Sequence, residues 1–438
     1  MLPDATITTL GAALRRGRLT AVQLLEECLA AIEAREPALN AFITVLAEDA
    51  RRQARAADAE LAAGRDRGPL HGMPLSLKDL IDLAGLPTTA ASRVRQDHRA
   101  ETDAPIAARL REAGAVFVGK CNLHELGLGT TGEESAYGPA RNPHARDRTP
   151  GGSSGGSAVS VASGMAIASL GTDTGGSIRI PASACGLVGL KPTHGEVSLE
   201  GIVPLAPSLD HAGPLARSVH DAATLHHVMT GGRGDAVLPA AVPGARLGVP
   251  RGYLLEVVEP AVQTAFAECS ARLEADGCRV EDVAIPHAGE TPEVYRRTQL
   301  PEAAVCHRDA LETRPDAFSA RVRQRLETGR KIPAVDYVRA QQARRRLAAE
   351  VDAALDGRAA LLLPTLPIVP PRLGADPETV RPLMLRLTQL FDVTGHPAVS
   401  LPCGTAGGLP AGIQLVGHRG RTAELLALAA ALEEVVRG

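Results

Sequence analysis

Apolar residues recur every three or four positions near the start of the chain, and this spacing predicts helices. The clearest segments are residues 7–14, residues 20–32 with Thr20 as the cap, and residues 46–63. A polar, Gly-containing stretch over 64–69 interrupts the pattern. We therefore expect residues 1–65 to form a helical N-terminal layer.

Short apolar runs follow and alternate with segments of helical spacing, as in 105–113 followed by 115–118. This alternation favours an α/β fold with a mostly parallel sheet covered on both faces by helices. Residues 216–245 are expected to hold one helix and a connection rich in Gly and Pro. Three more apolar runs predict strands at 246–249, 280–283 and 360–363.

Two stretches rich in Gly and Ser, residues 149–158 and 171–181, carry Ser153 and Ser177, which lie 24 residues apart. Flexible linkers are one interpretation. However, the segment between them is apolar and small, and it is typical of a buried helix that passes into a strand. Glycines in such a place let several backbone N–H groups converge on one anion or carbonyl oxygen.

Lysine is rare in this chain: only Lys78, Lys120, Lys191 and Lys331 occur among the 47 basic residues. Lys78 lies in the apolar run 72–81. A buried lysine can lose its proton and act as a base, whereas arginine stays protonated. Lys78 is therefore a candidate base, and the alternative is a lysine at a strand end that extends to water.

The residues around Lys78, Ser153 and Ser177 form three ordered motifs, Ser-Leu-Lys-Asp, Gly-Gly-Ser-Ser-Gly-Gly-Ser and Gly-Thr-Asp-Thr-Gly-Gly-Ser-Ile-Arg-Ile-Pro. In order and spacing they resemble the amidase signature family. The likeness is dense over residues 70–215, where the catalytic core motifs lie, and resumes at 395–403 and 409–417. It implies one undivided α/β/α layered domain, residues 1–438, around a large twisted mixed β-sheet.

The resemblance also implies a mechanism. Ser177 would attack the carbonyl carbon of an amide, and Ser153 would relay the proton to a neutral Lys78. A cis peptide bond is expected before Ser153. The oxyanion would be held by the backbone amides of Thr174, Gly175, Gly176 and Ser177. Supporting roles fall to Gly152, Ser154, Asp173 and Arg179, and Asp79 is expected to be structural.

The expected substrate pocket includes the segment 126–132, which follows Asn122. The carbonyl of Gly127 would meet the substrate N–H, and Leu128, Gly129 and Thr130 would line a wall. This wall is small and mostly uncharged, which favours a neutral acyl or aryl group. Residues 295–337 and 382–391 are expected to supply the other walls, with ordinary helix surface and core as the alternative. No residue distinguishes a carboxamide from an anilide, a carbamate or a urea.

Other interpretations remain open. Residues 151–155 match the G-x-S-x-G motif of an esterase with Ser153 as nucleophile, but a polar loop precedes them. Residues 114–121 nearly match a phosphate-binding loop, although their interior is strand-like. A scaffold without catalysis would not need Lys78 and both serines.

The main rival is the A subunit of glutamyl-tRNA amidotransferase, which has the same triad and passes ammonia to a partner protein. By resemblance, that protein carries an acidic residue for the amino group of glutamine ten residues before the Gly that aligns with Gly395. This chain has Leu385 there. A leucine cannot pair with an ammonium group, so we expect a free-standing hydrolase.

Composition changes this picture little. The chain has 438 residues, 45% of them hydrophobic, with a net charge of −3 and a pI near 6.5, so nothing points to nucleic acid or membrane partners. Seven scattered cysteines without a C-x-x-C motif indicate reduced thiols and a cytoplasmic location. We expect no metal or other cofactor, a small-molecule substrate, and a monomer or homodimer.

Overall fold

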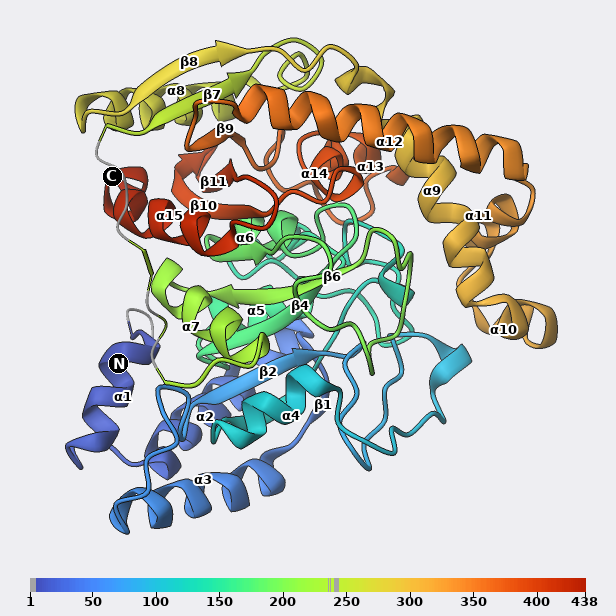
Figure 1. Cartoon of the computed structure of the whole chain (residues 1–438). Helices are drawn as coiled ribbons and strands as arrows, with labels where there is room; N and C mark the ends of the chain where they lie inside the picture. Colours follow the sequence, from blue (N-terminus) through green and yellow to red (C-terminus); the bar gives the residue numbers. More distant parts are fainter. Residues whose placement is uncertain (1–4, 235, 237, 240–243) are drawn as a thin grey trace.

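The computed structural model describes residues 5–234, 236, 238–239 and 244–438. At its centre is an 11-stranded sheet in the order β1-β3-β2-β4-β6-β5-β10-β11-β9-β7-β8 (Figure 1). The strands are β1 Phe42–Val45, β2 Pro74–Lys78, β3 Val116–Cys121, β4 Ala168–Asp173, β5 Val188–Lys191, β6 His211–Ala216, β7 Arg246–Pro250, β8 Arg279–Val283, β9 Ala360–Pro364, β10 Ala398–Ala406 and β11 Leu409–Val416.

The sheet is mixed, as the family resemblance implied. Strand β2 runs parallel to β3 and β4, and β7 runs parallel to β8 and β9. The central pairs from β4 to β9 are antiparallel. The mostly parallel sheet expected from the alternating pattern is therefore wrong for the centre of the sheet. No helix lies in the connection from β5 to β6, and β10 and β11 form a hairpin, so neither pair has the helical crossover that parallel neighbours need.

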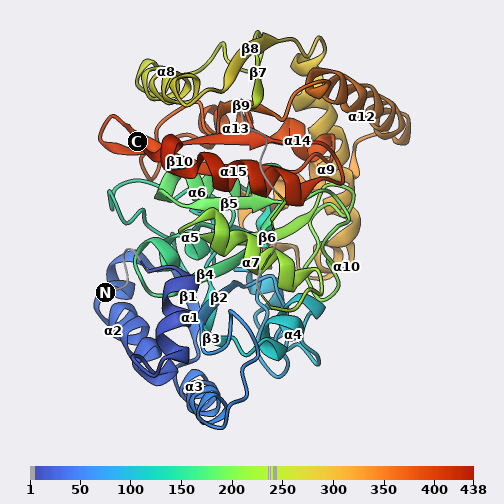
Figure 2. The same cartoon turned by 60° about the vertical axis from the view of Figure 1, so that its left-hand side comes forward.

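Two groups of helices pack on the central strands (Figure 2). One contains α5 and α6, which contact β4, β5 and β11, and the other contains α7, α8 and α15, which contact β6 and β10. The helices are α1 Ile7–Arg15, α2 Ala21–Leu39, α3 Ala47–Ala62, α4 Pro105–Glu112, α5 Gly155–Ala162, α6 Arg179–Cys185, α7 Val219–Met229, α8 Pro260–Ala275, α9 Thr291–Cys306, α10 Arg308–Thr313, α11 Ala320–Arg330, α12 Ala334–Leu355, α13 Pro377–Leu385, α14 Gln389–Val393 and α15 Thr422–Arg437.

The predicted N-terminal helices are present as α1, α2 and α3, with side-chain caps from Thr6 and Thr20 on the first two. The layer is not purely helical, because β1 lies inside it and pairs with β3. Only four residues long and bounded by helices, β1 has no period that would reveal it.

Most strands predicted after residue 70 are present. The run 115–118 forms buried β3, which excludes the phosphate-loop interpretation of this segment. The runs at 246–249, 280–283 and 360–363 form β7, β8 and β9. The helix expected within 216–245 is α7, and part of the Gly/Pro-rich connection after it, residues 235, 237 and 240–243, lies outside the described residues.

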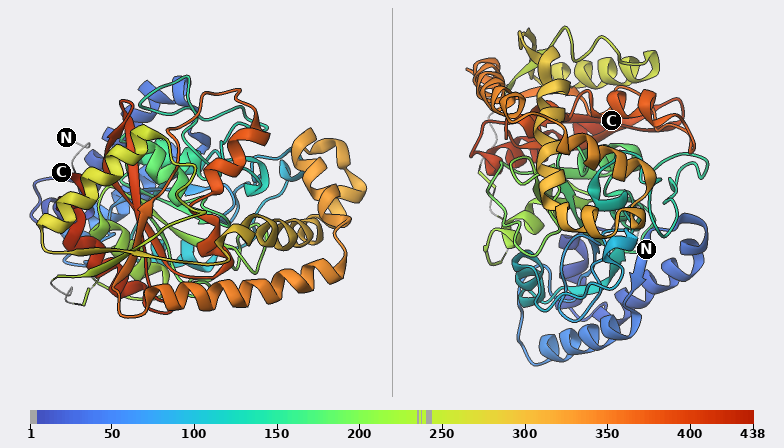
Figure 3. Two further views of the ribbon diagram at one scale, coloured as in Figure 1. Left: turned by 90° about the horizontal axis from the view of Figure 1, so that it is seen from above. Right: turned by 90° about the vertical axis from the view of Figure 1, so that its right-hand side faces the viewer.

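Helices α9 to α12 lie together at one side of the sheet (Figure 3). Helix α9 packs against α11 and α12 and also contacts α14. Tyr295 on α9 lies next to Gly175, so this group borders the second Gly/Ser stretch. Among the described residues, no helix combines the length and the apolar character needed to cross a bilayer.

Candidate active site

Lys78 is the last residue of β2, and its side chain is fully buried. Its Nζ donates hydrogen bonds to Ser153 Oγ and Thr172 Oγ1, both at 2.7 Å. The ammonium group therefore does not extend to water, which excludes that alternative. The same hydrogen bond brings together Lys78 and Ser153, the central residues of the first two motifs.

The environment of Lys78 favours proton exchange near neutral pH. Burial, opposed by the charges of Asp173 and Asp210, lowers the pKa of Lys78 to about 7. A pKa close to neutrality lets Lys78 accept a proton through Ser153 Oγ and give it back.

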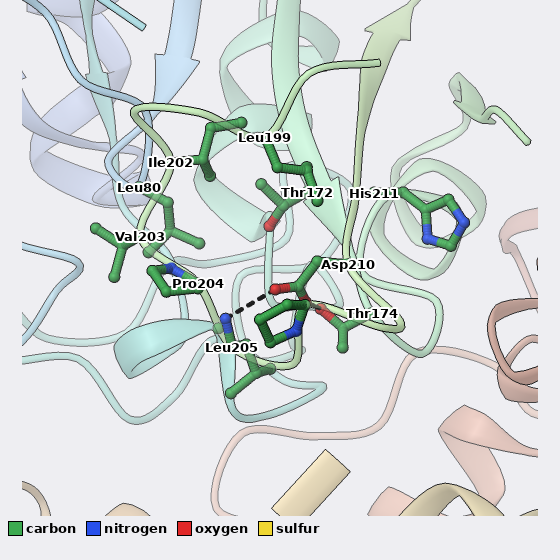
Figure 4. A pocket seen from close by; sticks show the side chains of 12 residues that line it. Leu80, Thr172, Thr174, Leu199, Ile202, Val203, Pro204, Leu205, Asp210 and His211 are labelled. Carbon is green, nitrogen blue, oxygen red and sulfur yellow. Dashed lines mark hydrogen bonds between the residues drawn. The ribbon is translucent and has the colours of Figure 1, made fainter. Parts of the chain in front are cut away.

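A cavity of about 250 Å³ lies beside this pair (Figure 4). Thr172, Thr174 and Gly127 connect it to the site, and its walls are mostly apolar. Asp210, at one side, accepts hydrogen bonds from the amide of Leu205 at 2.9 Å and from Thr174 Oγ1 at 2.6 Å. The remaining lining residues are Leu80, Leu199, Ile202, Val203, Pro204, Pro207 and His211.

The loop around Ser153 has the expected cis bond, between Gly152 and Ser153. A Cβ atom on Gly152 would lie 2.8 Å from the amide nitrogen of Gly132, so this close approach requires glycine. The amide of His124 donates to the Ser153 carbonyl at 3.1 Å. The segment 126–132 therefore packs directly on the loop that holds Ser153.

The predicted wall residues lie next to Ser153. A Cβ atom on Gly127 would be 3.6 Å from Ser153 Oγ. Leu128, Gly129 and Thr130 are buried in the same segment. Leu126 has a φ of 54°, a left-handed conformation that is unusual for a residue other than glycine, at the entry to this wall.

The two Gly/Ser stretches meet where the amide of Ser154 donates to the carbonyl of Ser177 at 3.2 Å. Both serines at the motif centres are buried, with Ser153 1% and Ser177 6% exposed. No strand precedes Ser153, since residues 149–154 form a loop, whereas the esterase motif places its nucleophile directly after a strand. Buried, hydrogen-bonded loops of this kind are also not flexible linkers.

The four amides expected as oxyanion donors differ in their hydrogen bonds. The Gly176 amide already donates to Asp173 Oδ1 at 2.6 Å, and the carbonyl of the same peptide unit, on Gly175, accepts from Thr388 Oγ1 at 2.6 Å. Both polar groups of this peptide are therefore occupied. Within the described part of the chain, the amides of Thr174, Gly175 and Ser177 donate to no other residue and stay available.

Asp173 and Arg179 brace this loop. Asp173 also accepts from the amides of Ile178 and Arg179, and Arg179 Nη2 pairs with Asp173 at 3.0 Å and with Asp392 at 2.6 Å. Burial acts to raise the pKa of Asp173. The charge and hydrogen bonds of Arg179, together with Asp392 and the charge of Lys191, hold that pKa well below its usual value. Arg179 also donates to Gln414 on β11, so the loop is tied to the sheet.

Some contributors were not expected from the sequence. Thr172, which accepts a hydrogen bond from Lys78, lies within the second Gly/Ser stretch. Its position five residues before Ser177 was the only sign in the sequence that it could belong to the site. Thr388 and Asp392 come from a segment that the sequence indicated only as a wall or its continuation. Asp79 has the structural role expected of it, because it pairs with Lys120 at 2.8 Å and accepts from the Thr89 amide.

The segments 295–337 and 382–391, which were expected to form further walls, also border the loop that contains Gly175. A Cβ atom on Gly175 would lie 2.5 Å from Tyr295 Oη and 3.1 Å from Leu385 Cδ2. Residues from α9 and α13 therefore cover the loop that carries the oxyanion donors. The described residues contain no group of three or more His, Cys, Asp or Glu side chains arranged for a metal ion.

The family model described as "Amidase" matches residues 23–426. The chain is 38% identical to the A subunit of the glutamyl-tRNA(Gln) amidotransferase of Roseiflexus sp. strain RS-1, with 99% of this chain and 97% of that protein covered. A solved structure named "Crystal structure of amidase" superposes with a TM-score of 0.93 at 41% identity, covering 99% of this chain and 100% of the other.

Another solved structure, the A subunit of the glutamyl-tRNA(Gln) amidotransferase of Thermotoga maritima, superposes with a TM-score of 0.83 at 34% identity and covers 99% of this chain and 95% of that chain. The family match spans most of the sequence, and both solved structures align over nearly its whole length. The chain therefore belongs to the amidase signature family, whose enzymes cleave carbon–nitrogen bonds.

Proposed function

We propose that this enzyme hydrolyses the C–N bond of a small amide through an acyl-enzyme on Ser177, with Ser153 and Lys78 as the proton relay. The observation that carries the proposal is the hydrogen bond of 2.7 Å from a fully buried Lys78 to Ser153 Oγ, together with a pKa of Lys78 of about 7. A lysine in this state is the base that serine activation needs.

The steps follow from the contacts. Ser177 Oγ attacks the carbonyl carbon, and its proton passes through Ser153 to Lys78. The oxyanion forms beside the free amides of Thr174, Gly175 and Ser177, each worth about 3–4 kcal/mol of barrier in comparable sites. The proton returns along the relay to the leaving amine, and a water molecule then releases the acyl group in the same way.

For the substrate we propose an amide without an ammonium group, with carbamates (urethanes) included. The Gly127 carbonyl would accept from the amide N–H, and the apolar cavity in Figure 4 suits an uncharged acyl or aryl part. Leu385, which packs at Gly175, offers an ammonium no counter-charge. Burying that charge unpaired costs several kcal/mol.

The second candidate is the A subunit of a glutamyl-tRNA amidotransferase. Full-length curated relatives with this name, at 38% and 37% identity, support it more strongly than they support a free hydrolase. The higher TM-score to the structure named as an amidase, 0.93 against 0.83, and Leu385 favour the hydrolase. We therefore keep as proposals a small-molecule substrate, a cytoplasmic location, no nucleic-acid or membrane partner, and a monomer or homodimer.

The nucleophile is tested by a serine-directed fluorophosphonate followed by peptide mapping. We expect label on Ser177 and none on Ser153, because only Ser177 lies beside the free amides. A Ser177→Ala variant should lose the label. Label confined to Ser153 would instead support an esterase-type nucleophile and remove Ser177 from the mechanism.

The two candidate functions separate in a substrate panel assayed with the purified chain alone. We expect turnover of p-nitroanilides, primary amides or aryl carbamates, and negligible turnover of glutamine because Leu385 cannot hold its ammonium group. Efficient release of ammonia from glutamine, alone or only after addition of a tRNA-binding partner protein, would establish the amidotransferase in place of the hydrolase.

A further inference from the structure

We propose that Asp210 is a positioning residue for the reaction: its carboxylate fixes Thr174, which supplies one of the proposed oxyanion amides, and its charge keeps Lys78 basic enough to take the proton. The inference rests on the proposed hydrolysis at Ser177. It adds a residue from the loop before β6, which the catalytic steps described above do not use.

Asp210 joins the loop beside the cavity to the turn that carries the oxyanion amides (Figure 4). Its Oδ2 accepts from the amides of Leu205 at 2.9 Å and Ala206 at 3.0 Å, and its Oδ1 accepts from Thr174 Oγ1 at 2.6 Å. Both oxygens therefore act as acceptors, as those of an ionised carboxylate do. The residue is buried, and in the described ranges no Lys, Arg or His side chain forms an ion pair with it.

Strand β4 connects Asp210 with Lys78. Thr172 and Thr174 lie two residues apart at the end of this strand, and alternate residues of a strand face the same side, so both side chains line the cavity. Thr172 Oγ1 accepts from Lys78 Nζ at 2.7 Å, and Thr174 Oγ1 donates to Asp210 at 2.6 Å. The carboxylate and the buried amino group therefore lie on the same side of β4.

The two carboxylates that act on Lys78 differ in their compensation. Asp173 pairs with Arg179 at 3.0 Å, whereas Asp210 has no cationic partner among the described residues. Burial lowers the pKa of Lys78, and the charges of Asp173 and Asp210 raise it, which leaves it at about 7. A weaker base would accept the proton from Ser153 less readily, so the uncompensated charge of Asp210 supports the relay.

Other titratable groups also surround Asp210. Besides Lys78 and Asp173 they are Glu302, Tyr295 and Cys306 on α9 and the imidazoles of His194 and His211. Burial lowers the pKa of both histidines and raises the pKa of the tyrosine and of the cysteine, so these four groups are neutral near pH 7. Glu302 is therefore the charged neighbour whose effect an experiment has to separate from that of Asp210.

Asp210→Asn tests the charge. The amide keeps the size of the side chain and removes the negative charge, so the pKa of Lys78 should fall further. We expect the rise of kcat/KM with pH to move to lower pH by about half a unit to one unit, and the rate on the plateau to fall about 3–30-fold. A midpoint equal to that of the wild type, at any rate, overturns the inference.

Glu302→Gln is the matched control. Glu302 holds the other side of the same loop, because it accepts from the amide of Ser208 at 3.0 Å and from its Oγ at 2.6 Å. The change loosens the loop from outside and leaves the carboxylate of Asp210 in place, so the midpoint should stay at the wild-type value. A shift as large as that of Asp210→Asn would mean that the profile responds to the loop and not to the charge, which overturns the inference.

Thr174→Val tests the contact, and it decides the matter if Asp210→Asn does not fold. Valine removes the hydroxyl that binds Asp210 and leaves the charge, so kcat/KM should fall about 3–30-fold while the midpoint stays. Thr174→Ser keeps the hydroxyl and should be faster than Thr174→Val. Equal rates for these two variants, or a wild-type rate for Thr174→Val, contradict the role of Asp210.

The probe is the p-nitroanilide or aryl carbamate that the wild type hydrolyses fastest, measured in a pH series from acid to mildly alkaline. The rate at which a fluorophosphonate labels Ser177 gives a second profile that involves no leaving group. Normal wild-type turnover with an unshifted Asp210→Asn profile defeats this inference alone. Absence of both turnover and Ser177 labelling in the wild type defeats the proposed function with it.

Discussion

Most lysines of this chain have buried side chains. Lys78, Lys120 and Lys191 are each fully buried, and only Lys331 is exposed. Burial alone does not make a base, because Lys120 pairs with Asp79 and Lys191 donates to the carbonyl of His396 at 2.6 Å. What distinguishes Lys78 is a hydroxyl partner that belongs to the site, Ser153.

Replacement of Lys78 by arginine tests the base. Lys78→Arg keeps the positive charge but cannot give a neutral form, so we expect activity to fall by about 10²–10⁴-fold or more. Wild-type kcat/KM should also rise as the pH increases through about 7, because the pKa of Lys78 lies there and the unprotonated form is reactive. Steady-state rates across a pH series from acid to mildly alkaline measure both effects.

The exposed Lys331 provides the control for this exchange. Lys331→Arg should retain wild-type activity and the same pH profile, since its side chain lies on the surface. Near-normal turnover of Lys78→Arg, or a wild-type profile that is flat through neutral pH, would remove Lys78 from the mechanism.

At the scale of elements, the turn between β4 and α6 depends on one buried cluster. Arg179 joins Asp173 to Asp392 on α14 and to Gln414 on β11, and all three charged side chains are fully buried. Asp173 in turn fixes the Gly176 amide. Loss of Arg179 would leave the buried carboxylates of Asp173 and Asp392 without the cation that they share.

We therefore expect Arg179→Met to lower the free energy of unfolding by about 3–5 kcal/mol. The urea midpoint should fall, and fluorophosphonate labelling of Ser177 should slow because the loop loses its brace. Arg372→Met is the matched control: its pair with Asp147 is exposed, so we expect a change below about 1 kcal/mol. A wild-type midpoint for Arg179→Met would show that the cluster contributes little.

Elements were predictable where their period was long or their composition clear. The pattern predicted β3, β7, β8 and β9, but not β6, because His-Ala-Gly-Pro-Leu-Ala contains Gly and Pro and no β-branched residue. Glycine spacing pointed to the proposed oxyanion loop, yet it could not reveal that the Gly176 amide donates to Asp173. Which donors remain free depends on side-chain contacts that spacing does not encode.

At the scale of the whole molecule, one sheet contains strands from residue 42 to residue 416. This continuity supports the single undivided domain, which we keep as a proposal. All members of the proposed triad lie between residues 78 and 177, within the motifs, and the structure brings Lys78 and Ser153 into contact. The motifs could not show which residues of 295–337 and 382–391 border the site, because Tyr295 and Leu385 come close to Gly175 only through the packing of α9 and α13.

Helix α9 lies at the side of the sheet in Figure 3, and this position bears on how substrate choice can change in evolution. Helices α9 and α13 place Tyr295 and Leu385 beside Gly175, whereas β2 and the loops before α5 and α6 carry the residues of the proposed triad. Substitutions in these helices could therefore change the substrate during evolution while the residues of the proposed triad stay the same. Such an architecture is expected to give relatives that share one catalytic centre and act on different substrates.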